Sequence, residues 1–195
     1  MKQFLLQMSG VPGAGKSTIA HHVGSRYGAI VVDLDVIRSA VLDGGVTVEG
    51  SGPAAYSAVY ALTRSLLDQG TSVVIDSPCG YDQILTTGLE IAGERGIAYK
   101  YVESWTDDLT LIDNRLRTRA PMRSQRRAVG LHAADLGDAD TDGEQLFRTW
   151  IQRTKRPAEG YLQVDATKPL NLILDEVNTY LEHGPAARLG CQVAR

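Results

Sequence analysis

Cysteine and long apolar runs are what this chain of 195 residues has least of. The two cysteines, Cys79 and Cys191, are too few for a disulfide framework or a set of paired metal ligands. Apolar stretches such as 4–8 and 73–75 are far shorter than the roughly 20 residues that span a bilayer. These shortages predict reduced thiols, no membrane partner and a cytoplasmic location.

A strong charge of either sign is also missing. The chain has 20 Lys and Arg against 23 Asp and Glu, a formal net charge of -3. The molecule as a whole therefore has no bias towards nucleic acid or acidic membranes, and any basic surface must be local. Hydrophobic residues make up 43% of the chain, which is enough for a buried core without a metal or disulfide.

Short β-branched apolar runs alternate with longer helical patterns, which is typical of β-α units around a parallel sheet. The strands are expected at 3–8, 29–33, 72–76, 97–103 and 161–165. The helices are expected at 16–26, 35–42, 54–69, 81–95, 107–118, 143–155 and 170–182. The sequence therefore predicts an α/β fold with a five-stranded, mostly parallel sheet and helices on both faces.

Three segments do not fit this alternation. Residues 43–53 are rich in glycine, and residues 119–142 are rich in arginine and then in aspartate, so both are expected to be loops. Residues 184–195 lack helical periodicity and are expected to form a loose tail. We therefore predict a single domain over 1–183.

The clearest motif lies between the first expected strand and the first expected helix, and it fits the pattern G-x-x-x-x-G-K-[ST]. Its residues are Gly10, Val11, Pro12, Gly13, Ala14, Gly15, Lys16 and Ser17, followed by Thr18. Glycines let backbone amides curl around phosphate oxygens, and the following helix turns its unpaired amides toward the same anion. Lys16 would neutralise the β- and γ-phosphates of ATP, and Ser17 would ligate Mg²⁺. The motif predicts a P-loop NTPase three-layer sandwich; the alternative is a glycine-rich turn that happens to precede a lysine.

Four motifs in this order resemble the P-loop kinases that include polynucleotide 5′-hydroxyl kinase, chloramphenicol phosphotransferase and the zeta-toxin kinases. They are residues 10–17, Asp33-Leu34-Asp35-Val36-Ile37-Arg38, Val73-Val74-Ile75-Asp76 and Arg115-Leu116-Arg117-Thr118-Arg119. The resemblance covers residues 3–120 or so. It implies transfer of the γ-phosphate of ATP to a hydroxyl group.

The second motif offers a general base. Phosphoryl transfer needs a carboxylate that orients the attacking hydroxyl and accepts its proton, at the carboxyl end of a strand beside the phosphate loop. Asp35 fits this place, and the resemblance implies that Asp35 is the base and that Arg38 binds the acceptor. Two alternatives stay open. Asp35 could cap a helix that begins at Val36, and Asp33, on the same face of an extended chain, could be the base or a magnesium partner.

Asp76 ends the third expected strand as a Walker-B-like carboxylate does, where it would hold Mg²⁺ or position the acceptor. The alternative is a turn residue before Ser77-Pro78. No glutamate follows Asp76, the run 76–79 lacks the D-x-x-G pattern of GTP switches, and the chain has no N-K-x-D motif. A motor or a switch is therefore less favoured than a kinase.

Arginines gather from the last turn of the fifth expected helix onward. They are Arg115, Arg117, Arg119, Arg123, Arg126 and Arg127. The resemblance implies that this segment, about 115–142, is a lid. Arg115 and Arg119, four apart, would share a helix face and reach the transferring phosphate on closure, while Arg123 would contact the nucleotide or the acceptor. The alternative is a solvated basic face or a surface for an acidic partner.

The sequence thus predicts a Mg²⁺-dependent kinase that phosphorylates a hydroxyl of a small molecule such as a nucleoside, a sugar or an antibiotic. A nucleic-acid 5′-hydroxyl end is a second possible acceptor, because the local arginines could grip phosphates. A nucleotide-binding regulator that hydrolyses ATP slowly is an interpretation from a different class. The acceptor's identity and the oligomeric state stay open, since acceptor pockets are built from scattered side chains.

Overall fold

The structure, a computed structural model, describes residues 2–131 and 142–189. Within these ranges five strands form one sheet in the order β2-β3-β1-β4-β5. The strands are β1 (Phe4–Ser9), β2 (Ile30–Asp33), β3 (Val73–Asp76), β4 (Ala98–Trp105) and β5 (Leu162–Asp165). Each neighbouring pair is parallel, so the predicted five-stranded sheet is confirmed, and its described strands are parallel throughout.

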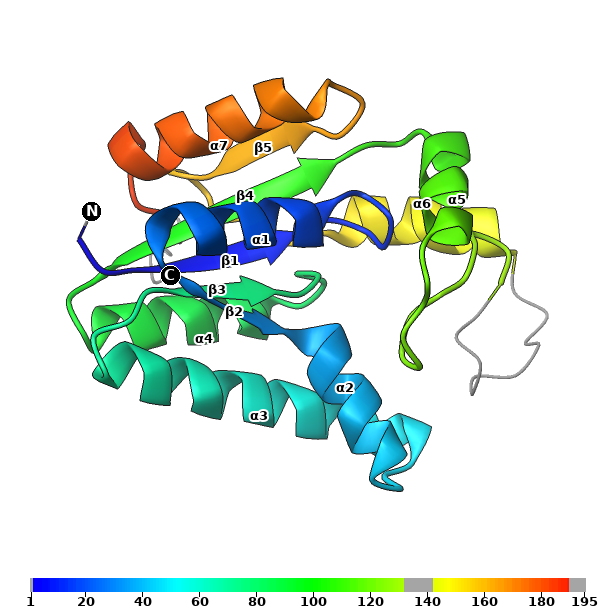
Figure 1. Cartoon of the computed structure of the whole chain (residues 1–195), viewed down its shortest axis with the longest axis horizontal. Coiled ribbons are helices and arrows are strands. Elements are labelled where there is room, and N and C mark those ends of the chain that lie inside the picture. Colours follow the sequence, from blue (N-terminus) through cyan, green and yellow to red (C-terminus); the bar gives the residue numbers. More distant parts are fainter. Residues whose placement is uncertain (1, 132–141, 190–195) are drawn as a thin grey trace, which may run out of the picture.

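Helices cover both faces of the sheet, as predicted (Figure 1). Helices α1 (Lys16–Tyr27) and α7 (Leu170–His183) pack on one face, and α3 (Val48–Asp68) and α4 (Asp82–Gly93) pack on the other. Three further helices lie near the carboxyl ends of the strands (Figure 1). They are α2 (Leu34–Asp43), α5 (Leu109–Thr118) and α6 (Gly143–Arg153).

Alternation along the strands divides the core into two layers, because successive side chains point to opposite faces of a sheet. Leu5, Val73 and Ile75 belong to the cluster that packs against α3 and α4. Leu6 and Val74 belong to the cluster that packs against α1 and α7. The central strands are thus apolar on both faces, as expected of a parallel sheet covered by helices.

The prediction of a loop over 43–53 is wrong for its second half. Helix α3 begins at Val48, and Pro53 lies inside its second turn. Thr47 caps the helix, because its side chain accepts a hydrogen bond from the Gly50 amide at 3.3 Å. The buried Ser51 packs within this first part of the helix. The cap and this tertiary burial outweigh the low helix propensity of the two glycines and the proline.

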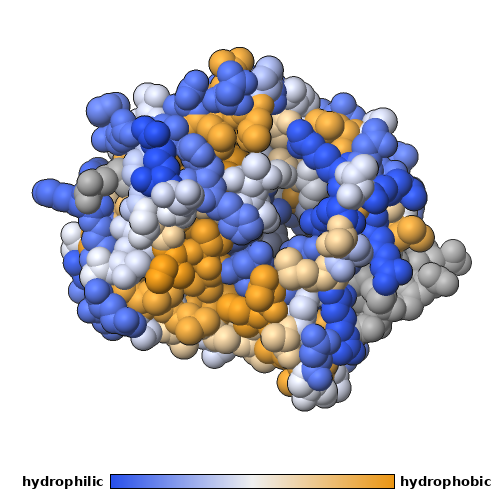
Figure 2. All heavy atoms as spheres, viewed as in Figure 1, coloured by the Kyte–Doolittle hydropathy of each residue, from blue (hydrophilic) through white to orange (hydrophobic). Residues whose placement is uncertain are grey.

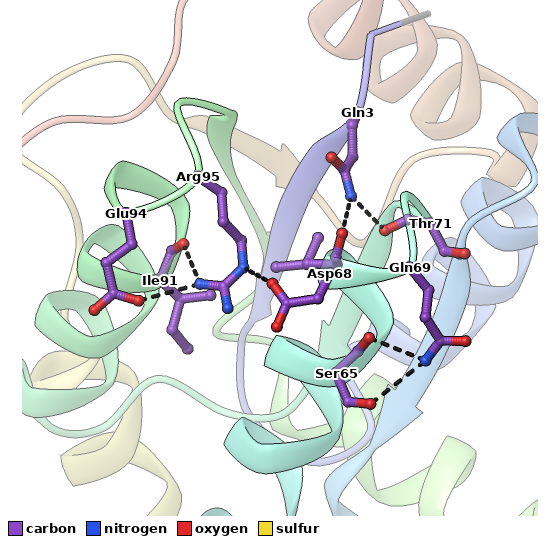
Figure 3. A network of polar contacts seen from close by, with 9 residues as sticks. Gln3, Ser65, Asp68, Gln69, Thr71, Ile91, Glu94 and Arg95 are labelled. Atoms are coloured by element: carbon purple, nitrogen blue, oxygen red, sulfur yellow. Dashed lines mark hydrogen bonds and ion pairs between the residues drawn. The ribbon is translucent and has the colours of Figure 1, made fainter.

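A polar network fastens the amino ends of the central strands (Figure 3). Gln3, just before β1, donates from Nε2 to the carbonyl oxygens of Leu67 (2.7 Å) and Thr71 (3.1 Å). Arg95, after α4, donates to Asp68 Oδ1 at 2.8 Å and to the Ile91 carbonyl at 3.1 Å. The end of the sheet farthest from the glycine-rich motif is therefore cross-linked through side chains.

Residues 184–189, which we expected in a loose tail, are attached to the sheet. The Ala187 amide donates to the Tyr99 carbonyl at 2.8 Å, and Ala187 is buried. Lys100 Nζ, on the same strand, donates to the Gly184 carbonyl at 2.6 Å. The remainder of that expected tail, 190–195, lies outside the described residues. No helix among those described is long and apolar enough to cross a membrane.

Candidate active site

The glycine-rich motif joins β1 to α1, as the sequence predicts. Gly10 has φ of +126°, and a Cβ at this position would lie 2.2 Å from the Ser104 carbonyl oxygen. Gly15, with φ of +97°, precedes the first residue of α1, and no side chain among the described residues caps this helix end. Its first amides are therefore available to an anion, which is the feature that lets such a loop hold phosphate.

Neighbouring elements hold this P-loop in place. Ser104, near the end of β4, donates from Oγ to the Ala14 carbonyl at 2.6 Å. Val11 and Ala14 pack in a small apolar cluster with Ile112 and Leu116 of α5. The same cluster includes residues of the arginine-rich segment and α6. The P-loop is thus connected by packing to the segment that the sequence predicts to act on the transferring phosphate.

Lys16 is the charged centre of the site. Its Nζ donates to the Val11 carbonyl at 3.1 Å. Burial lowers the pKa of Lys16, the carboxylates of Asp76, Asp35 and Asp33 raise it, and the positive charge of Arg119 lowers it. The four partners come from three separate sequence motifs, so the fold brings the predicted catalytic charges together beside the P-loop.

Asp33 and Asp76 end adjacent strands and are direct partners in the register of β2 and β3. Burial and then the Asp76 carboxylate raise the pKa of Asp33, while hydrogen bonds from the amides of Asp35 and Val36 lower it. Asp33 Oδ1 accepts these two bonds at 2.7 and 3.3 Å and is the N-cap of α2. Asp33, not Asp35, caps this helix, because α2 begins one residue earlier than the sequence suggests.

The carboxylate of Asp35 is therefore left for another task. Asp35 lies in the first turn of α2. Its Oδ2 accepts a hydrogen bond from Gln125 Nε2 at 2.9 Å, and its Oδ1 lies 3.4 Å from Ser124 Oγ. Sequence reasoning missed both partners. They sit among arginines in a segment without periodicity, and no local signal links them to a residue about ninety positions earlier.

The arginine-rich segment divides into side chains that face the site and side chains that face solvent. Figure 2 shows hydrophilic residues gathered over α5 and the loop that follows it. Arg117 and Arg127 are exposed, whereas Arg115 and Arg119 are half-buried. The solvated-face interpretation thus fits only part of the cluster. Residues 132–141 of the expected lid lie outside the described residues.

Arg115 and Arg119 do not share a helix face, because α5 ends at Thr118 and Arg119 has an extended backbone. Arg115 donates to the Ala166 carbonyl at 2.9 Å, and its guanidinium lies beside Gly15 of the P-loop. Arg119 donates to the Arg126 carbonyl at 3.1 Å. Burial lowers the pKa of Arg119, while Asp35 and Asp33 raise it. Arg115 thus lies beside the P-loop backbone, and Arg119 lies within electrostatic reach of Asp35 and Asp33.

Of the remaining predicted residues, Arg38 lies on α2 and Arg123 contacts the end of α2. Arg38 donates from Nε to Ser51 Oγ, on α3, at 3.0 Å. Arg123 forms an ion pair with Asp43 at 2.9 Å, at the end of α2. The roles predicted for Arg38 and Arg123 in acceptor or nucleotide binding stay predictions.

The residues present fit a magnesium ion with few protein ligands. Asp76 is 4% exposed, and its Oδ2 has no hydrogen-bond partner among the described residues. Ser17 is exposed in the first turn of α1. The described side chains form no group of three or more His, Cys, Asp or Glu that could hold a metal. Magnesium bound with a nucleotide needs no such cage, because phosphates and water supply most of its ligands.

This fold and this loop define a P-loop NTPase-like α/β protein. A family model described as "AAA domain" matches residues 5–141. The chain belongs to that family.

Curated relatives occur in mycobacteria. An uncharacterised protein of Mycobacterium tuberculosis strain H37Rv is 30% identical over 170 residues, which cover 80% of this chain and 34% of that protein. An uncharacterised protein of Mycobacterium bovis matches with the same values. The chain thus spans about a third of the length of the curated relatives it matches.

Several solved structures share the fold. A sugar kinase from Janibacter sp. HTCC2649 has a TM-score of 0.61 at 17% identity, covering 93% of this chain and 95% of that one. The APS kinase of Mycobacterium tuberculosis, in complex with AMPPNP and APS, has a TM-score of 0.63 at 17% identity, covering 93% and 98%. A gluconokinase from Sinorhizobium meliloti 1021 has a TM-score of 0.56 at 16% identity, covering 93% and 91%. At these identities the likeness shows the fold, which is that of P-loop kinases.

Proposed function

We propose that this protein is an ATP-dependent kinase that phosphorylates a hydroxyl of a small molecule. One observation carries the proposal. Asp35, a carboxylate that does not cap its helix, lies within the electrostatic reach of both Lys16 and Arg119 beside the P-loop. A base for a hydroxyl, a cation for the phosphates and a second cation for developing charge are the parts that phosphoryl transfer requires.

Each part has a defined task in the proposed reaction. The P-loop amides and Lys16 bind the β- and γ-phosphates, and Ser17 and Asp76 hold magnesium. ATP supplies the phosphoryl group, and the metal offsets phosphate charge. Asp35 orients the acceptor hydroxyl and accepts its proton. Arg119 stabilises the charge that develops on the transferring group.

Arg115 stands apart from this set, because it donates to the carbonyl of Ala166, the residue that follows β5. We assign Arg115 to holding the nucleotide beside Gly15. Arg38 is the proposed acceptor-binding residue, since it lies one turn beyond Asp35 on α2 and, among the described residues, only its Nε donates a hydrogen bond, to Ser51 Oγ.

The choice of a small acceptor draws on two facts. The net charge of -3 gives the chain no general attraction for nucleic acid, and the named kinases with this fold are a sugar kinase, a gluconokinase and an APS kinase. The resemblance to polynucleotide 5′-hydroxyl kinase keeps a nucleic-acid end as the competing acceptor. A regulator that only hydrolyses ATP is the competing class.

A screen of hydroxyl-bearing metabolites tests the proposal, with ATP consumption and phosphorylated product measured together. A 5′-hydroxyl oligonucleotide forms a separate arm, assayed at low and high salt, because binding through several phosphates falls steeply as salt rises. Stoichiometric transfer to a small molecule supports the proposal. Salt-sensitive transfer to the oligonucleotide alone identifies the competing acceptor, and hydrolysis without any product identifies a regulator.

A further inference from the structure

The loop after α5 docks along α2 in a regular register. Three polar residues of α2 are four apart and so lie on one face of the helix: Asp35, Ser39 and Asp43. Three consecutive loop residues meet them in reverse order. Arg123 pairs with Asp43 at 2.9 Å, the Ser124 amide donates to Ser39 Oγ at 3.1 Å, and Gln125 Nε2 donates to Asp35 Oδ2 at 2.9 Å.

The contact at the Asp35 end differs from the other two, because Gln125 is itself fixed. Its side chain is 8% exposed. Its Oε1 accepts a hydrogen bond from the Met122 backbone amide at 3.2 Å, and the backbone amide of Gln125 donates to the Met122 carbonyl at 2.9 Å. With Oε1 engaged by a backbone donor, the amide nitrogen must face Asp35. The orientation of this donor is therefore set by the loop before any acceptor binds.

We propose that Gln125 is a positioning residue for the Asp35 carboxylate, an inference that rests on the proposed function. A general base works only when a lone pair points at the proton to be removed, and a small misplacement of a reacting group costs much of the rate. A fixed donor on Oδ2 sets the plane of the carboxylate and leaves Oδ1 for the acceptor hydroxyl, since among the described residues Oδ1 accepts only the long hydrogen bond from Ser124 Oγ at 3.4 Å.

The same loop links the two halves of the site. Arg119, at the start of the loop, acts on the phosphate side, and Gln125 fixes the base on the acceptor side. The two are held together, since Arg119 donates at 3.1 Å to the carbonyl of Arg126, the residue after Gln125. Docking of this loop on α2 therefore places the arginine and the base relative to each other.

Two variants separate positioning from docking. Gln125→Leu keeps a similar volume and removes the donor to Asp35, whereas Asp43→Ala removes the ion pair with Arg123 at the other end of the docked loop. We expect kcat to fall about 10- to 100-fold in Gln125→Leu, with acceptor KM and ATP Kd little changed. Asp43→Ala should alter kcat by less than about threefold, because the ion pair that it removes is exposed. Equal losses in the two variants overturn the proposal, because the contact is then only a docking contact.

A second measurement tests whether Gln125 acts through Asp35. In an Asp35→Asn background, Gln125→Leu should cause little further loss, because residues that act as a unit are non-additive. Full additivity overturns the proposal. So does faster ATP hydrolysis without acceptor in Gln125→Leu, since it would mean that the amide restrains the base. If the wild-type protein transfers phosphate and Gln125→Leu matches it, only the positioning role fails; if the wild type transfers phosphate to no acceptor, the proposed function itself fails and this role with it.

Discussion

Asp33 and Asp76 face each other across two adjacent parallel strands, and each is the last residue of its strand. Burial of Asp33 raises its pKa, and so does repulsion from the neighbouring Asp76 carboxylate. Asp33 offsets part of this unfavourable energy by accepting hydrogen bonds from two backbone amides as the N-cap of α2. Asp33 therefore caps a helix, and a cation bound between the two carboxylates would relieve their repulsion.

Asp33→Asn should make the protein more stable at pH 7. Because the pKa of Asp33 is raised in the folded state, ionisation weakens the fold, and this penalty grows as the pH rises from the ordinary aspartate range through the raised pKa. The gain in Tm over wild type should vanish below about pH 3, where both states carry the proton. Asp33→Ala is the control: it also lacks the charge but loses the cap, so it should be about 1 kcal/mol less stable than Asp33→Asn. Thermal unfolding across pH measures both.

Lys16→Met should abolish turnover and raise the Tm of the free protein. The pKa of Lys16 is lowered mainly by burial, so the charged form destabilises the folded state at neutral pH and an apolar side chain of similar length removes that penalty. ATP should raise the Tm of the wild type but scarcely that of the variant. Lys2→Met, at an exposed position, should change stability by less than about 0.5 kcal/mol. A lower Tm in Lys16→Met would mean that attraction to the three carboxylates outweighs burial.

Asp35→Asn should lower kcat by about 10² to 10⁴, the usual share of a general base, and leave the Kd for ATP nearly unchanged. The substitution keeps shape and hydrogen-bonding capacity but cannot accept the hydroxyl proton. Steady-state kinetics and ATP binding measured on the same samples separate the two effects. If Asp33→Asn shows this loss and Asp35→Asn does not, Asp33 is the base.

Arg119→Ala should reduce kcat by about 10³ or more while ATP affinity changes little, because the contact is made with charge that develops in the transition state. Arg127→Ala is the matched control, since Arg127 belongs to the same segment but is exposed. The two variants should differ in kcat and not in ATP Kd at saturating Mg²⁺. Small, equal effects would remove Arg119 from the mechanism.

Arg156→Ala should destabilise the fold by about 3 to 5 kcal/mol. Glu103, at 1% exposure, receives two hydrogen bonds from the Arg156 guanidinium and one from Gln163 at 2.9 Å, and truncation would leave a buried carboxylate without its counter-charge. Arg153→Ala, on the exposed side of α6, should cost less than about 0.5 kcal/mol. Urea unfolding of both variants gives the comparison. A loss below about 1 kcal/mol would contradict a stabilising role for this ion pair.

The strands and the P-loop could be predicted from the sequence, because the residue types of each short segment determine them. β-Branched runs such as 73–75 indicate a strand, and glycines at the spacing that phosphate binding requires indicate the P-loop. Helix starts were less readable. Glycine and proline over 48–53 favoured a loop, yet Thr47 and the packing of Ser51 begin α3 there, because tertiary burial overrides a weak local propensity.

The sequence by itself determined the fold class, the phosphate loop and the order of the charged motifs, since each depends on residues that are close together along the chain. Only the tertiary structure decided which aspartate caps α2 and which carboxylate is left for chemistry. It also decided that Gln125 meets Asp35, that Arg115 lies beside Gly15 and that Arg119 follows α5 with an extended backbone. The physical reason is that hydrogen bonds between segments ninety residues apart depend on how helices end and loops dock, and no spacing in the sequence records that.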